Sequence, residues 1–143
     1  MTQPTTALAF DFGLSRIGVA FGQRITATAS PIDTVRAKEG TPDWQQVDGL
    51  IREWQPQALV VGMPVGQQNS ETSIHSSLGA FVVELEKRYG LPVFRVDETL
   101  TSREAQARLK HQRQTGQKSK RVKKGDVDSL SAQLILERWL SQT

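Results

Sequence analysis

The sequence contains no cysteine, so the chain can form no disulfide and has no thiolate to act as a nucleophile or metal ligand. Long apolar runs are also missing: stretches such as ALVVGMPVG fall far short of the ~20 residues that cross a bilayer. The opening residues MTQPTT carry no basic region ahead of an apolar stretch, which argues against a signal peptide. We therefore expect a cytoplasmic protein with no membrane partner.

One segment has no acidic residue at all. Residues 105–125 hold eight of the 18 lysines and arginines, which leaves ten basic residues against 15 acidic ones in the remainder. The net charge of +3 therefore comes from this segment alone. Such a concentration of positive charge is a candidate anion-binding surface, although charge runs are also commonly solvated loops.

Three stretches rich in β-favouring residues open the chain, over residues 7–12, 16–21 and 25–35. The turn residues between them predict that these three strands pair as antiparallel hairpins. Gly22 and Gln23 are predicted to form the second turn. Pro31 cannot donate a hydrogen bond to a neighbouring strand, so it is expected at a sheet edge or a bulge.

The apolar period then alternates between helix and strand. We expect helices over residues 41–54, from about 70 to 89, over 101–112 and over 126–140, and strands over 57–64 and 91–98. In the first helix Thr41 is the expected cap and Pro42 the first helical residue. The order predicts a single α/β domain over residues 1–143: a mixed five-stranded sheet, its first three strands antiparallel, with helices on both faces.

Carboxylates occur at three places that this topology could bring together. Asp11 lies inside an apolar strand, Asp97 and Glu98 end another, and Asp126 and Asp128 open the last helix. A carboxylate cluster is stable mainly when it holds cations, and its hard oxygen ligands suit Mg²⁺ or Mn²⁺. Two such ions would stabilise the attacking and leaving oxygens of phosphodiester hydrolysis.

Other roles are open for each acid. Acidic residues in the first turn of a helix commonly complement its dipole, and those at a strand end can simply be solvated. Asp11 is harder to explain in this way, because a desolvated charge inside an apolar strand needs a partner. The two histidines, His75 and His111, are expected on a helix surface or as accessory phosphate contacts.

Four segments together resemble the ordered blocks of the YqgF/RuvX family: DFGLSRIGVAFG, ALVVGMP, VDETLTS and KKGDVDSLSAQLILERWL. The resemblance covers about residues 7–140. It implies a ribonuclease H-like fold related to Holliday junction resolvases and a nuclease that processes the 5′ end of pre-16S ribosomal RNA. The family usually has arginine after the Asp-Glu pair, where this chain has Thr99, so a substrate contact there is in doubt.

Carried over residue by residue, the acidic site of the family falls on Asp11, Glu98 and Asp128. The resemblance implies that these three carboxylates are catalytic and bind Mg²⁺ or Mn²⁺, and that Asp11 bridges two ions. Asp97 is expected on the other face of its strand, and Asp126 has no expected counterpart. Whether either contributes stays open.

The basic segment fits a nucleic-acid substrate. Five of its residues directly precede the helix with Asp128 and are expected to contact the phosphate backbone without reading sequence: Lys118, Lys120, Arg121, Lys123 and Lys124. No aromatic residue is interleaved with them, so base stacking is not indicated.

The leading hypothesis is a metal-dependent endonuclease of pre-16S rRNA maturation, acting on structured or precursor rRNA as a monomer or weak homodimer. A DNA junction resolvase and a non-catalytic nucleic-acid-binding assembly factor are the alternatives. An actin-like ATPase is disfavoured, because that architecture surrounds its nucleotide with two such domains and this chain has the length of one.

Overall fold

The structure is a computed structural model that describes residues 4–63, 72–97 and 124–141. Its elements in chain order are β1 (Thr6–Asp11), β2 (Arg16–Gln23), β3 (Thr28–Lys38), β4 (Thr41–Pro42), α1 (Trp44–Trp54), β5 (Ala58–Met63), α2 (Thr72–Tyr89), β6 (Val93–Asp97) and α4 (Lys124–Ser141).

The strands form one mixed sheet in the order β4-β3-β2-β1-β5-β6. The first three strands are antiparallel, as predicted, and β5 lies parallel to both β1 and β6. The sheet has six strands instead of the expected five. The extra strand, β4, is only two residues long and pairs with the end of β3, where Ala37 faces Pro42 and Lys38 faces Thr41.

The start of α1 therefore differs from the prediction. Thr41 and Pro42 belong to a strand, and Asp43 caps the helix in place of Thr41. The Asp43 side chain accepts a hydrogen bond from the backbone N–H of Gln45 at 3.2 Å. The Asp43 N–H donates to the carbonyl of Arg36 at 2.8 Å, and this bond ties the cap to β3 and holds the preceding residues against the sheet.

Pro31 lies at an irregularity of β3, as its chemistry requires. Val19 of β2 faces Asp33, whereas Ala20 faces Pro31, so β3 has one extra residue at Ile32. The register shift is a β-bulge, and it places the proline where no ladder hydrogen bond is needed from its nitrogen.

The second turn was predicted too early. Gly22 and Gln23 continue β2, and the turn lies over residues 24–27, where Ala27 adopts a positive φ of 54°. Gly22 stays in the strand because α4 packs directly on it: a Cβ at Gly22 would lie 2.8 Å from Leu136 Cδ2.

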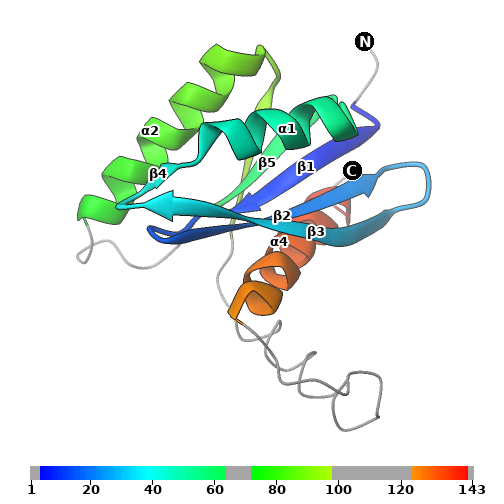
Figure 1. Ribbon diagram of the computed structural model, residues 1–143. Helices are drawn as coiled ribbons and strands as arrows, with labels where there is room; N and C mark the ends of the chain where they lie inside the picture. The colour runs from blue at the N-terminus through cyan, green and yellow to red at the C-terminus, as the bar shows by residue number, and fades with distance from the viewer. Residues whose placement is uncertain (1–3, 64–71, 98–123, 142–143) are drawn as a thin grey trace, which may run out of the picture.

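Helices cover both faces of the sheet, with α1 and α2 on one face and α4 on the other (Figure 1). The layer beneath α1 and α2 is built from bulky side chains, and its largest fully buried members include Phe10, Phe81, Leu8, Ile17 and Leu59. Phe81 of α2 packs its ring against three other aromatic rings, those of Phe10, Phe12 and Trp44.

The layer beneath α4 is built from small residues on the sheet side and larger ones on the helix side. The sheet contributes mainly alanine and valine: Ala7, Ala9, Ala20, Ala29, Ala58, Val60 and Val96. The helix contributes Ile135, Leu136, Trp139 and Leu140 across from them. Small side chains on the strands let α4 lie close to the sheet.

The two long helices agree with the predicted ones to within a few residues. Helix α2 ends at Tyr89 and is followed by Gly90 at a φ of 64°, the left-handed conformation that glycine tolerates best. The helix expected over 101–112 lies outside the described residues. Within the described ranges, no helix combines the length and apolar character that a membrane span requires.

Candidate functional site

Asp11 is the last residue of β1, and it lies on the face of the sheet that α4 covers. Its neighbours Phe10 and Phe12 are buried in the layer under α1 and α2, so strand alternation turns Asp11 to the opposite face. Because β1, β5 and β6 run parallel, Asp11 lies at the same edge of the sheet as Met63 and Asp97, the ends of the other two strands. Ligands of α/β sheets commonly bind at this carboxyl edge.

Gly18 brings the last helix to this edge. It faces Asp11 directly across the β1–β2 ladder, so the two residues share one face of the sheet. A Cβ built on Gly18 would lie 1.9 Å from the backbone oxygen of Asp128 and 2.8 Å from the nitrogen of Ser129. No side chain larger than hydrogen fits there, and the backbone of α4 therefore rests directly on β2 beside Asp11.

The side chain of Asp128 is held by Arg16, the first residue of β2. Arg16 Nε donates to Asp128 Oδ2 at 2.6 Å, a charge-assisted hydrogen bond between residues 112 positions apart. The two side chains are 42% and 22% exposed, so solvent screens the pair and its contribution to folding stability is at most about 1 kcal/mol. The contact matters more for where it holds the Asp128 carboxylate than for stability.

Arg16 is a site residue that sequence analysis missed. A signal was present, because Arg16, Gly18, Ala20 and Gly22 alternate along β2 and make one polar or small face. The structure shows that this face lies under α4, with the glycines at the points of closest approach.

Among the other predicted site residues, Glu98 follows the last residue of β6 in the chain and lies outside the described residues. Lys118, Lys120, Arg121 and Lys123 lie outside them as well. Lys124 is the first residue of α4. Of the acids left open, Asp97 is the last residue of β6 and Asp126 lies in the first turn of α4.

In the described part of the chain, the backbone of Asp128 thus lies against Gly18, and the partner of Gly18 across the ladder is Asp11. That part of the chain contains no group of three or more metal-ligating side chains. The donor set that it does contain fits a hard divalent cation, because carboxylate oxygens are the ligands that Mg²⁺ and Mn²⁺ prefer. One oxygen of the Asp128 carboxylate accepts from the guanidinium of Arg16.

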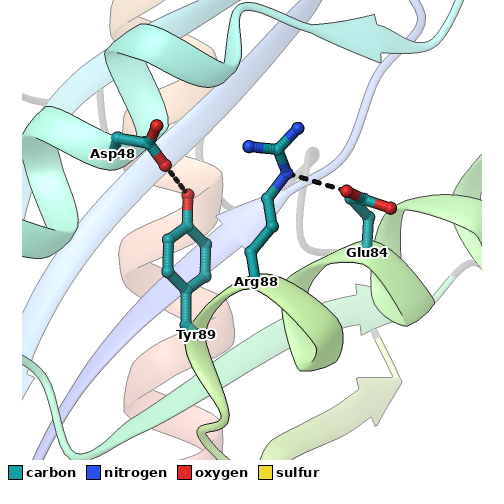
Figure 2. Close-up of polar contacts among 4 residues, drawn as sticks. All are labelled: Asp48, Glu84, Arg88 and Tyr89. Atoms are coloured by element: carbon teal, nitrogen blue, oxygen red, sulfur yellow. Dashed lines mark hydrogen bonds and ion pairs between the residues drawn. The ribbon is translucent and has the colours of Figure 1, made fainter.

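A second group of polar contacts joins α1 and α2 on the other face of the sheet (Figure 2). The hydroxyl of Tyr89 donates to Asp48 Oδ1, and Arg88 Nε donates to Glu84 Oε2 at 2.8 Å. The Arg88 guanidinium also lies over the ring of Trp44, 4.4 Å from its centroid. Burial and the Asp48 carboxylate raise the pKa of Tyr89 well above its ordinary value. Each of these polar groups has a partner. We call this set of contacts between α1 and α2 the seam, and its role is to hold the two helices together.

Comparisons with known proteins agree with this geometry. The family model described as "RuvX: Holliday junction resolvase" matches residues 5–142. A protein of Legionella pneumophila strain Philadelphia 1 named "Putative pre-16S rRNA nuclease" is 46% identical over 136 residues, covering 95% of each chain. A protein of the same name from Francisella tularensis subsp. holarctica strain FTNF002-00 / FTA is 42% identical over 135 residues, covering 94% of this chain and 96% of its own.

Solved structures share the fold at much lower identity. The RuvC protein of T. thermophilus in complex with a Holliday junction substrate superposes with a TM-score of 0.57 at 16% identity, over 96% of this chain and 94% of its own. The Thermus thermophilus RuvC structure superposes with a TM-score of 0.52 at 15% identity, over 96% of this chain and 97% of its own. The predicted ribonuclease H-like fold is thereby confirmed.

Proposed function

We propose that this chain, which belongs to the RuvX Holliday junction resolvase family, is a divalent-metal-dependent endonuclease that processes the 5′ end of pre-16S rRNA. One observation carries the proposal: Gly18 allows the backbone of Asp128 to rest on β2 next to the residue that pairs with Asp11, at the carboxyl edge of the sheet. Family membership and the names of the relatives support the nuclease class.

Asp11, Asp128 and Glu98 would hold the metal. A bound Mg²⁺ or Mn²⁺ supplies Lewis-acid activation of the phosphodiester and of the attacking water. The carboxylates supply the negative charge that a divalent cation requires. Arg16 positions the Asp128 carboxylate through a single Nε contact. No side chain is required to form a covalent intermediate, and the phosphodiester bond would be broken by direct attack of water.

The substrate would be bound through its phosphates. Lys118, Lys120, Arg121, Lys123 and Lys124 supply five positive charges immediately before Asp128 in the chain. Contacts of this kind give affinity that falls steeply with salt and carries no sequence information. Precursor rRNA is the substrate that the names of the relatives support, and the cytoplasm is where such a precursor would be processed.

A DNA junction is the second candidate substrate. It is favoured by the description of the family as Holliday junction resolvases and by the fold shared with a RuvC–junction complex. The two substrates are distinguished by offering both to the same protein preparation.

The test is a cleavage assay on pre-16S RNA and on four-way junction DNA, each with Mg²⁺ and with Mn²⁺. We expect metal-dependent cleavage of the RNA, and we expect Asp11→Asn and Asp128→Asn to lower its rate by more than about 100-fold. The matched control is Asp33→Asn, an exposed aspartate of β3 whose substitution should leave the rate unchanged. Tight RNA binding without cleavage, insensitive to both carboxylates, would instead identify a binding factor.

A further inference from the structure

A pair of arginines lies beside the two carboxylates, on strands β2 and β3. Arg16 of β2 faces Arg36 of β3 directly across the ladder, and the next pair on the same face is Gly18 with Thr34. Since residues opposite one another share a face, both arginines lie on the side that carries Asp11 and α4. The sheet thus places two arginines opposite one another, one pair along the same face from Gly18, the partner of Asp11.

Folding stability does not account for this pair. Like charges directly opposite one another on antiparallel strands destabilise a sheet. Arg16 has Asp128 as its partner, whereas the exposed side chain of Arg36 forms no ion pair with any carboxylate whose side chain the structure describes. An anion that bridges both guanidinium groups would turn the repulsion into attraction.

The backbone at Arg36 is held firmly although it lies near the edge of the sheet. Its N–H donates to Gln46 Oε1 at 3.2 Å, and its carbonyl accepts from the Asp43 N–H at 2.8 Å. Gln46 Nε2 also donates to the carbonyl of Thr34 at 3.0 Å, so one glutamine side chain pairs with β3 as a neighbouring strand would. Arg36 is therefore presented from a fixed position.

The Arg16 guanidinium has hydrogen-bond donors that its contact with Asp128 does not use. A guanidinium carries five N–H groups, one on Nε and four on the terminal nitrogens. The contact with Asp128 uses Nε, and the four terminal N–H groups of Arg16 make no hydrogen bond within the described residues. A planar fork of this kind suits a phosphate, which it binds through two parallel hydrogen bonds.

We propose that Arg16 and Arg36 form a phosphate track, in which the two guanidinium groups bind the backbone of the nucleic-acid substrate next to the scissile bond. Arg16 links the track to the carboxylates, because the group that binds phosphate also holds Asp128. The proposal rests on the proposed function for the identity of the anion. It adds a second contact surface, on β2 and β3, to the lysine-rich segment before α4.

The test measures binding in EDTA, where no cleavage occurs, by fluorescence anisotropy of a labelled hairpin RNA at several salt concentrations. We expect Arg36→Gln to weaken binding roughly three- to tenfold and to lower the slope of log K against log salt by about 0.7–0.9, the loss of one phosphate contact. Arg16→Gln should have a similar effect on binding and also slow cleavage. The matched control is Arg52→Gln, the same charge change at an exposed residue of α1 on the opposite face, with no expected effect.

Two readouts separate this proposal from the proposed function. If Arg16→Gln and Arg36→Gln lose affinity but the unmodified protein cleaves neither substrate, the result would support the track and contradict the proposed nuclease activity. Normal metal-dependent cleavage, with an affinity and salt slope in Arg36→Gln equal to those of Arg52→Gln, would overturn the track and leave the nuclease standing. Absence of metal-free binding by the unmodified protein would overturn the track as well. Arg36→Lys, which keeps the charge, should recover part of the salt slope.

Discussion

The two faces of the sheet are built for different purposes. Beneath α1 and α2 lie large aromatic and aliphatic side chains, packed around Phe81. Beneath α4 the strands present glycine and alanine, and the helix backbone reaches within contact of Gly18. The large side chains under α1 and α2 bury much apolar area per residue. The small residues under α4 bury less apolar area but let the helix approach the sheet closely. The polar groups of the candidate site that lie within the described residues, Asp11, Arg16 and Asp128, are found at the end of the second face.

The largest expected loss of stability comes from the bulky face. Phe81 is 2% exposed, and its replacement by alanine should lower the free energy of unfolding by ~3–5 kcal/mol, because a cavity is left among three aromatic rings. Denaturant unfolding measures this. Val83→Ala, on the same helix at a side chain 52% exposed, is the control, with an expected change within ~0.5 kcal/mol. Comparable losses from the two variants would contradict the assigned core.

The next effect comes from the close-packed face, where function should suffer more than stability. Gly18→Ala places a Cβ 1.9 Å from the Asp128 carbonyl oxygen, so α4 must shift. We expect ~1–3 kcal/mol of destabilisation and loss of nuclease activity in protein that remains folded.

Gly49→Ala is the matched control for Gly18→Ala. Gly49 lies inside α1 with no atom within 4 Å of the added Cβ, so the same substitution should stabilise the protein by ~0.5–1 kcal/mol and keep activity. Full activity in folded Gly18→Ala would show that the close approach does not position Asp128.

The smallest effect concerns the seam between α1 and α2. Tyr89→Phe removes a hydrogen bond to Asp48 and should cost about 1 kcal/mol near neutral pH. Burial and Asp48 raise the pKa of Tyr89 in the folded protein, so its contribution is complete below pH ~10, the value for an unfolded chain, and is lost as the pH rises further.

The chain has a single tyrosine, so this titration is directly visible in the ultraviolet. The tyrosinate absorbance of the folded protein should appear at clearly higher pH than that of the urea-unfolded protein. Between pH 9 and 11 the stability of the unmodified protein should fall more steeply than that of Tyr89→Phe. A folded-state midpoint equal to the unfolded one would rule out the contact with Asp48.

Local patterns were sufficient to predict most of the fold. The turn residues between the first three strands predicted their antiparallel pairing, and the backbone chemistry of Pro31 placed the bulge. The predicted start of α1 was wrong because Thr41 and Asp43 are both good helix caps. The choice between them depends on a hydrogen bond from Asp43 to Arg36 on another strand, which no local pattern contains.

The candidate site was predictable only in part for the same reason. The resemblance to the family selected Asp11 and Asp128 as candidate site residues. The contact between Arg16 and Asp128 joins residues 112 positions apart, and it depends on how closely α4 can approach β2. A glycine at position 18 is compatible with a close approach, but the sequence does not show which element approaches. The cost of a Cβ there becomes visible only once the helix is in place.

The central claim is that Asp11 and Asp128 form one cation site because Gly18 lets the helix carrying one of them rest beside the other. Isothermal titration with Mn²⁺ tests it most directly, on the unmodified protein, Asp11→Asn, Asp128→Asn and the double variant. The account predicts saturable binding that each single substitution weakens at least ~10-fold, with the double variant much less affected than the two losses combined. Unchanged Mn²⁺ affinity in either single variant, or no saturable binding by the unmodified protein, would contradict it.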